Sequence, residues 1–226
     1  MHRLKTLVRI TRAPFFTGVI VPTMLGAVLA WRDGYFHLGY FLLTLVGIVC
    51  VHAALDMSND YFDHRIGTDD INDAGTPFSG GSRVIQEGIA TPRQILLASL
   101  ACYAVAIGIG LFLAFMRGWT VLWLGLVGMF LAFFHNAPPV RIYNLLPGLG
   151  ELAVLVGFGP LVVMGAYYVQ AQQLTPESVL ISVPVGLLMS AVLYINEFPD
   201  MEADRLAGKK TIAVVLGRRR AVIGYV

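Results

Sequence analysis

The stretch LGYFLLTLVGIVCVHAAL, residues 38–55, runs directly into DMSNDYFDHRIGTDD, residues 56–70. The first part is largely apolar and long enough for a helix that crosses the hydrocarbon core of a bilayer. The second part contains five aspartates. We therefore expect a membrane helix with several carboxylates at its end. Because carboxylates gathered at the edge of lipid repel one another, they need a cation to compensate them.

The whole sequence has the composition of an integral membrane protein. Of 226 residues, 57% are hydrophobic and 13% are charged, which is more apolar than a soluble domain. Apolar runs of membrane-crossing length predict six helices, near residues 13–31, 38–55, 95–116, 119–134, 149–169 and 179–198, and a further run begins with AVIGYV at residues 221–226. The predicted fold is all-α, a polytopic transmembrane helical bundle that forms a single domain over residues 1–226.

The basic residues predict the orientation of this bundle. Of the 16 Lys and Arg residues, only Arg32 and Arg117 fall in loops on one predicted side of the membrane. Lys and Arg near helix ends favour the cytoplasmic side, so we predict a cytoplasmic N-terminus. No basic groove with interleaved aromatic residues is present in the sequence, so nucleic acid is not an expected partner.

Asp56, Asn59, Asp60 and Asp63 form a first polar cluster behind the run at 38–55. Residues three, four and seven positions apart share one face of a helix. If the helix continues past the apolar run, these four oxygen-bearing side chains point the same way.

A second cluster, in INEFPDMEADRL, ends the last complete predicted helix. Asn196, Asp200 and Asp204 are spaced i, i+4 and i+8, which again gives one stripe, although Pro199 is expected to bend the helix there. Both clusters fall on the predicted cytoplasmic side. Two acid stripes at one face indicate a shared binding site.

The chemistry of these groups favours Mg²⁺ and a diphosphate. Mg²⁺ binds through one or two carboxylates together with phosphate oxygens of a substrate, so two separated Asp clusters can hold one diphosphate between them. Basic side chains near the clusters would neutralise the remaining phosphate oxygens; these are Arg65, Arg83, Lys209 and Lys210. A substrate with a charged head and an apolar tail would explain why the acids lie at the edge of lipid.

Several other polar residues carry two interpretations. Arg12 precedes the first helix. It is either a basic anchor that sets the orientation in the membrane or a side chain that contacts ligand on the same face as the acids. Glu151 opens the fifth helix, where it favours the positive helix end or orients a polar acceptor. His52 and His135 are predicted to be hydrogen-bonded packing residues. Thr91, with Pro92 and Gln94 behind it, predicts a capping box at the start of the third helix.

The two clusters resemble the signatures of the UbiA superfamily of intramembrane prenyltransferases, NDxxDxxxD and DxxxD. Asn59, Asp60 and Asp63 match the first signature, and Asp200 and Asp204 match the second.

The first signature departs from the common pattern, because Gly67 stands where its fourth acid is expected. The sequence is similar there to the menaquinone branch, the 1,4-dihydroxy-2-naphthoate prenyltransferases, whose acid is displaced to the position of Asp69. The resemblance extends through GGSRVIQEG, GELAVLVGFGPLVVMGAYY and DMEADRLAGKKTIAVVLG, and so covers nearly the whole chain.

This resemblance implies a helical bundle around a central cavity with a lateral opening to lipid, in a bacterial or archaeal cell membrane. It implies transfer of a prenyl chain from a polyprenyl diphosphate to an aromatic acceptor, with Mg²⁺ as cofactor and membrane lipid around the protein. The residues that match the family's signatures are Asp60, Asp63, Asp200 and Asp204 for catalysis and metal binding, with Asn59 and Asp69 as further metal ligands. Spacing and charge add Asn196 as a metal ligand, Arg65, Arg83, Lys209 and Lys210 for the diphosphate, and Arg12 and Glu151 for the acceptor. Family members usually have nine helices, so we expect that about the last quarter of the domain is absent from this sequence.

Three alternatives stay open. A UbiA-type enzyme with another acceptor, such as 4-hydroxybenzoate or a different polar aromatic compound, would carry the same acid clusters. A membrane cation transporter would place acids near the bilayer midplane and use discontinuous helices. A noncatalytic membrane subunit is the third. The sequence lacks GxxxxGK[ST], HExxH and GxSxG, which disfavours ATP-driven transport, metalloproteolysis and serine hydrolysis.

Overall fold

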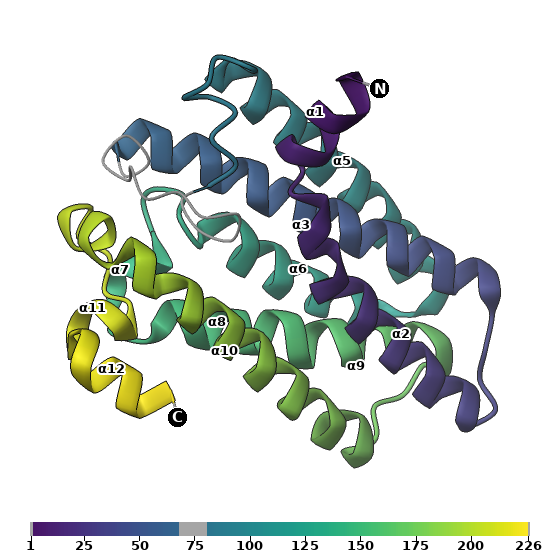
Figure 1. Cartoon of the computed structure of the whole chain (residues 1–226). Coiled ribbons are helices and arrows are strands. Elements are labelled where there is room, and N and C mark those ends of the chain that lie inside the picture. The colour runs from purple at the N-terminus through teal and green to yellow at the C-terminus, as the bar shows by residue number, and fades with distance from the viewer. Residues whose placement is uncertain (1, 68–80, 226) are drawn as a thin grey trace.

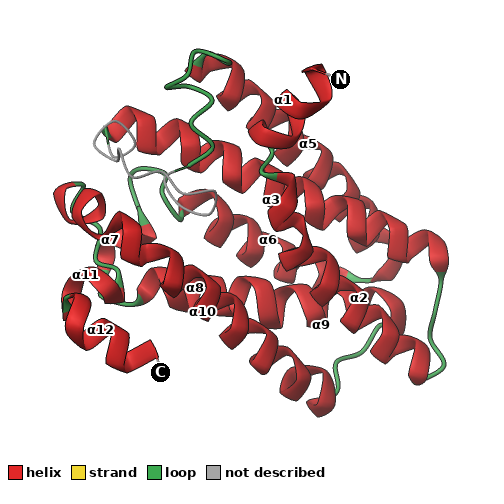
Figure 2. Ribbon diagram, in the orientation of Figure 1, coloured by secondary structure: helices red, strands yellow, loops and turns green. Residues whose placement is uncertain are grey.

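A computed structural model of the chain describes residues 2–67 and 81–225, and in these residues every regular element is a helix (Figures 1 and 2). The chain starts with α1 (His2–Ile10) and a short 3-10 turn, η1 (Ala13–Phe16). The bundle is built from α2 (Thr17–Arg32), α3 (Leu38–Ile66), α5 (Pro92–Arg117), α6 (Trp119–Phe134), α8 (Leu149–Val156), the π-helical turn η2 (Gly157–Leu161), α9 (Val162–Ala171) and α10 (Pro176–Leu206). Three short helices flank one end of it, α7 (Ile142–Leu145), α11 (Ile212–Leu216) and α12 (Arg218–Tyr225).

Five helical segments of the described chain are long and apolar enough to cross a membrane. They span Ala13–Arg32, Leu38–Ile66, Pro92–Arg117, Leu149–Ala171 and Pro176–Leu206, which confirms five of the six predicted spans. The sixth is present as α6 but has only 16 residues. At 1.5 Å per residue, a helix of that length covers about 24 Å, less than the ~30 Å hydrocarbon core.

Many large apolar side chains point out of the bundle, as expected for helices that contact lipid. Trp31, Phe115 and Leu180 are 68%, 86% and 71% exposed. Without water around the helices, such side chains carry no penalty in a bilayer, and the all-helical fold satisfies the backbone hydrogen bonds inside each segment.

The predicted helix boundaries follow from the local sequence. Thr91 and Gln94 form the predicted capping box at the start of α5, with Pro92 in the first turn. The helix α3 continues beyond the apolar run to Ile66 and ends at Gly67, whose φ of 85° is in the left-handed region that glycine tolerates. The extension of α3 places the first acid cluster on a helix, as the spacing predicted. The second cluster is also helical, since α10 continues through Pro199 to Leu206.

The helices approach one another closely through small residues. A Cβ atom added to Gly26 of α2 would lie 2.3 Å from the carbonyl oxygen of Val163 in α9, and one added to Gly186 of α10 would lie 2.3 Å from the carbonyl oxygen of Leu155 in α8. Such glycines let backbones pack directly in a membrane, where dispersion contacts drive association. They fix α8, α9 and α10 against the rest of the bundle and thereby set the frame of the site.

Substitution Gly26→Ala tests this packing. The new methyl group would press on backbone atoms, which cannot move without shifting α9, so we expect the free energy of unfolding to fall by about 1–3 kcal/mol. Gly108→Ala is the matched control, because Gly108 has open space around its Cα and alanine favours the helix. Thermal unfolding in detergent measures both; equal melting temperatures for the two variants would contradict the packing argument.

Candidate active site

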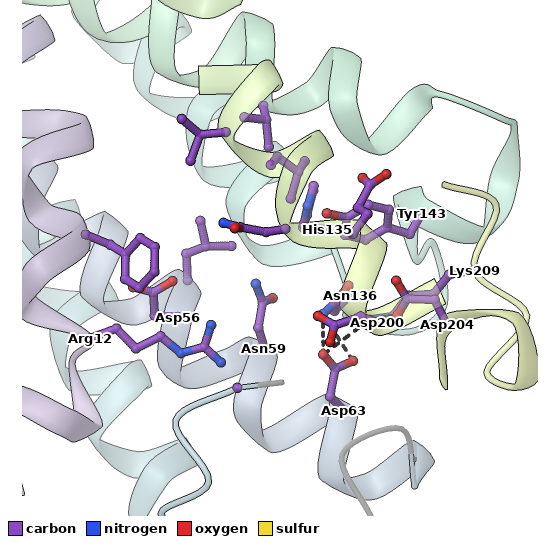
Figure 3. A pocket seen from close by; sticks show the side chains of 18 of the residues that line it. Arg12, Asp56, Asn59, Asp63, His135, Asn136, Tyr143, Asp200, Asp204 and Lys209 are labelled. Atoms are coloured by element: carbon purple, nitrogen blue, oxygen red, sulfur yellow. Dashed lines mark hydrogen bonds and ion pairs between the residues drawn. The ribbon is translucent and has the colours of Figure 1, made fainter. Parts of the chain in front are cut away.

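The two acid stripes meet at one end of the bundle, called the acid end below. The ammonium nitrogen of Lys209 lies 3.1 Å from Asp204 Oδ1 and 3.4 Å from Asp63 Oδ2. Figure 3 shows Asp63 of α3 facing Asp200 and Asp204 of α10. Clusters that are far apart in the sequence are thus brought together around one cation.

Asp60 has a different partner from Asp63. It is 3% exposed and forms an ion pair with Arg12. It also accepts a hydrogen bond from the Ser82 N–H at 3.2 Å. Arg12 therefore contacts the acid stripe, which is one of the two interpretations that the sequence left open.

A polar cavity of about 220 Å³ opens between the stripes. Among its lining residues are Arg12, Asp56, Asn59, Asp63, Asn196, Asp200, Asp204 and Lys209, of which all but Asn196 are labelled in Figure 3. All eight come from the two polar clusters of the sequence or from the residues predicted to contact ligand. The cavity is the site at which both stripes can reach one molecule.

The other predicted site residues lie outside the lining of this cavity. Asp60 does not line the cavity, but it forms an ion pair with Arg12, which does. Arg65 and Lys210 are exposed, and Lys210 Nζ donates to the Leu145 carbonyl at 3.2 Å. Arg83 is partly buried in the segment that follows the gap at 68–80.

Glu151 and Asp69 complete the predicted set. Glu151 is buried at the start of α8, and its Oε1 accepts the Ile212 N–H at 2.5 Å. Its contact is therefore with the beginning of α11. Asp69 is outside the described residues.

A second cavity, lined mainly by apolar side chains, continues from the first. It has a volume of about 390 Å³ and is surrounded by α3, α5, α6, α8, η2 and α9. The two cavities share five lining residues, His52, Leu55, His135, Val154 and Phe158. Together they form one space with a charged head region and an apolar body.

Aromatic rings pack where the two cavities join. His52 makes edge-on contacts with Phe16 and Phe158, with ring centroids 5.8 Å and 5.4 Å away. The His135 ring lies 4.2 Å from the Tyr143 ring. Both histidines pack against aromatic rings, and both also line the two cavities.

Burial lowers the pKa of His135 to about 3, with the nearby Lys209 ammonium as a smaller cause. The imidazole is neutral at physiological pH. The positive charge that faces the acids therefore comes from Arg12 and Lys209.

Asn136 was missed as a site residue by the sequence analysis. Its Nδ2 donates to both carboxylate oxygens of Asp63, at 3.2 Å and 3.1 Å. It follows the apolar run of α6, and a single amide there carries no periodic signal. Only the fold shows that it faces Asp63.

Glu197 was also missed, although the sequence held a signal for it. It is 4% exposed and lines the polar cavity. Its spacing from Asp200 and Asp204 is i, i+3 and i+7, which places the three acids on one helical face.

The donor set suits Mg²⁺ by its chemistry. Asp56, Asn59 and Asp60 each bury one side-chain oxygen that has no hydrogen-bond partner among the described groups, and such hard oxygens are the ligands that Mg²⁺ prefers. No three His, Cys, Asp or Glu side chains in the described ranges are close enough to form a metal site by themselves. An arrangement of this kind fits an ion shared between protein carboxylates and substrate phosphate oxygens.

The chain belongs to the UbiA prenyltransferase family, whose profile matches residues 19–226. Family membership and the five apolar helices make it an integral membrane protein.

Curated relatives have similar sequences over most of this chain. The 1,4-dihydroxy-2-naphthoate octaprenyltransferase of Bacillus subtilis is 30% identical, and the alignment covers 95% of this chain and 67% of that protein. The Escherichia coli protein of the same name is 34% identical, with 91% and 65% covered. The 2-carboxy-1,4-naphthoquinone phytyltransferase of Synechocystis is 31% identical, with 92% and 65% covered. The chain thus spans about two thirds of the length of these relatives.

Solved structures share the fold. A UbiA homolog from Archaeoglobus fulgidus bound to GPP and Mg²⁺ matches with a TM-score of 0.72 at 16% identity, over 97% of this chain and 72% of that one. The same homolog bound to DMAPP and Mg²⁺ gives a TM-score of 0.70 at 17% identity. At this identity the likeness establishes the architecture of the bundle.

Substitution Lys209→Met tests the bridge between the stripes. It leaves Asp63 and Asp204 without their shared ammonium, so we expect the free energy of unfolding to fall by about 3 kcal/mol. Millimolar Mg²⁺ should restore more of the melting temperature in this variant than in the unaltered protein, because the metal supplies the missing positive charge. Lys210→Met is the control, since Lys210 is exposed. Identical unfolding of the two variants, with and without Mg²⁺, would refute the bridge.

Proposed function

We propose that the protein transfers a polyprenyl group from a polyprenyl diphosphate to an aromatic acceptor, with 1,4-dihydroxy-2-naphthoate as the favoured acceptor, in menaquinone biosynthesis. One observation carries the proposal: the acid stripes of α3 and α10 face one polar cavity, and this cavity shares a wall with an apolar one. The names of the curated relatives support the naphthoate acceptor. The ligands of the solved relatives support a prenyl diphosphate as donor.

The polar cavity would bind the diphosphate. Mg²⁺ held by Asp63, Asp200 and Asp204, with Asp60, Asn59, Asn196 and Asp69 assisting, would act as a Lewis acid toward the departing diphosphate. Lys209 and Arg12 line the same cavity, and their positive charges would attract the phosphate oxygens that carboxylates repel. Arg65, Arg83 and Lys210, which do not line it, would steer the anion toward its mouth.

The apolar cavity would bind the prenyl chain. Its walls exclude water, so the allylic cation left by departure of the diphosphate would survive until the acceptor ring attacks it. The rings of His52 and Phe158 lie where the two cavities join. Their π-faces would stabilise positive charge at that point.

We further propose that the N-terminus and the acid end lie on the cytoplasmic side of a bacterial or archaeal cell membrane. By their positions in the sequence, nearly all Lys and Arg residues fall in the loops or helix ends on this side of the membrane, with Arg32 and Arg117 as the exceptions. Such an excess of basic residues is typical of the cytoplasmic side. A water-soluble acceptor and diphosphate would reach the cavity from that side.

The transporter alternative has one feature in its favour. The segment α8–η2–α9 is interrupted by a π-helical turn at Gly157–Leu161, and transporters use broken helices. Their charged sites, however, lie near the midplane of the bilayer. Asp63 and Asp204 lie at the ends of α3 and α10, which favours the enzyme.

Asp63→Ala and Asp200→Ala should each lower Mg²⁺-dependent prenyl transfer at least about a hundredfold, because each removes a carboxylate that would hold the metal. Glu202→Ala is the control on α10, the helix of Asp200, since Glu202 is exposed and pairs with Arg205. The assay follows labelled prenyl diphosphate in membranes of the full-length protein, with 1,4-dihydroxy-2-naphthoate and 4-hydroxybenzoate as competing acceptors. Retained transfer by either Asp variant would contradict the proposed roles, and ion flux without diphosphate release would favour a transporter.

Gly165→Leu should shorten the prenyl chain that the protein accepts. Gly165 lines the apolar cavity and has open space at its Cβ position, so a leucine there would fill volume needed by a long tail. We expect the ratio of transfer from long-chain to short-chain donors to fall about tenfold. Gly108→Leu is the control, because Gly108 has open space but does not line this cavity. Equal chain-length profiles for the two variants would show that the tail lies elsewhere.

A further inference from the structure

We propose that Glu197 recognises a hydroxyl group of the aromatic acceptor and so selects hydroxyarenes for this site. This inference rests on the proposed function and names the acceptor chemistry of the same cavity. It is carried by a buried carboxyl group that the diphosphate chemistry above does not use.

Glu197 buries an acidic side chain without a partner. The residue is 4% exposed, and neither Oε1 nor Oε2 has a hydrogen-bond partner among the described groups. It nevertheless lines the polar cavity. A buried acceptor without a donor is strongly unfavourable, so the arrangement favours a ligand that brings a donor to this position.

One donor beside Glu197 is the Ala213 N–H, but it makes no hydrogen bond of ordinary geometry to the carboxyl oxygens. Glu151 also lies beside Glu197 and is itself an acid, so a hydrogen bond between the two carboxyl groups requires a proton on one of them. Glu151 Oε1 accepts the Ile212 N–H at 2.5 Å. The Lys209 ammonium lies between Asp63 and Asp204, 3.4 Å and 3.1 Å away. Arg12 is paired with Asp60.

The charge of this corner restricts the ligand. Two carboxyl groups lie together, so a phosphate or a carboxylate placed here would be repelled. A neutral O–H group would instead donate to Glu197 at no electrostatic penalty. The acceptor would therefore be held by a ring hydroxyl, and any carboxylate on it would point toward the cations of the cavity.

The depth of Glu197 fits an acceptor rather than a diphosphate. Along α10 it precedes Asp200 by three residues and Asp204 by seven, so it lies about 5 Å and about 10 Å further from the acid end. The rings of His135 and Tyr143, which meet edge-on, belong to the same cavity (Figure 3). An aromatic ring bound there would lie between the diphosphate and the apolar cavity, where the first carbon of the prenyl chain is expected.

The test combines removal of the carboxylate with removal of the hydroxyl. Transfer to 1,4-dihydroxy-2-naphthoate and to its two monomethyl ethers is measured in membranes of the full-length protein, for the unaltered chain, Glu197→Leu and Glu197→Gln. In the unaltered protein we expect one ether to have a KM about tenfold to a hundredfold higher than the parent. Glu197→Leu should raise the KM for the parent by a similar factor and abolish the discrimination between parent and ether.

Glu197→Gln keeps the shape of the side chain and one acceptor oxygen. Because a hydrogen bond to a neutral amide is weaker than one to a carboxylate, the KM ratio of ether to parent should fall severalfold without reaching one. This variant keeps the test decisive if Glu197→Leu does not fold. Glu202→Gln, on the exposed face of α10, should leave all values unchanged.

Two further readouts separate this role from others. The KM for the prenyl diphosphate and the Mg²⁺ concentration for half-maximal rate should each change less than twofold in the Glu197 variants. A raised Mg²⁺ requirement would make Glu197 a metal ligand and overturn the inference. Unchanged ether discrimination in Glu197→Gln would overturn it as well. Failure of the unaltered protein to prenylate any acceptor would overturn the proposed function itself.

Discussion

The structure depends on the compensation of buried carboxylates at the edge of a membrane. Asp60, Asp63 and Asp204 lie where water is scarce, and each has a cation against it, Arg12 for the first and Lys209 for the other two. Buried ion pairs contribute little net stability, but removing one partner is strongly unfavourable. The shared ammonium therefore links α3 to the end of α10, and the bundle closes around a polar cavity instead of excluding its charges.

The position of Lys209 is set by the chain on either side of it. The Lys209 N–H donates to the Asp204 carbonyl at 2.9 Å, and the next N–H, that of Lys210, donates to the Tyr143 carbonyl at 2.7 Å. Glu151 then accepts the Ile212 N–H. These bonds attach the segment after α10 to α7 and α8, so helices from the middle of the chain hold the cation that joins the two acid stripes. The same contacts thus neutralise the acids, join α7 and α8 to the end of α10, and shape the polar cavity. The apolar cavity beside it gives room for the tail of an amphiphilic substrate.

The sequence pattern predicted those features that depend on neighbouring residues alone. Hydropathy placed the long helices, the Thr91–Gln94 capping box placed the start of α5, and the spacing of Asp56, Asn59, Asp60 and Asp63 placed them on one face. The facing of α3 and α10 was inferred from chemistry and is confirmed by the Lys209 contacts. Asn136 was not predictable, because its role arises from a contact across 73 residues. Glu197 was overlooked although its spacing from Asp200 and Asp204 places it on their helical face, because its burial is visible only in the fold. Hydropathy also placed α6 at the residues that it occupies, 119–134, although at 16 residues this helix is shorter than the other predicted spans.

The central claim is that both acid stripes bind a single diphosphate whose tail enters the apolar cavity. The most direct measurement is an experimental structure of the full-length protein in lipid with Mg²⁺ and an unreactive prenyl thiodiphosphate. The account predicts one diphosphate in contact, through metal, with Asp63 on one side and Asp200 or Asp204 on the other, and a prenyl chain beside Phe158 and Gly165. A diphosphate held by one stripe alone, or a chain lying outside the bundle, would contradict it.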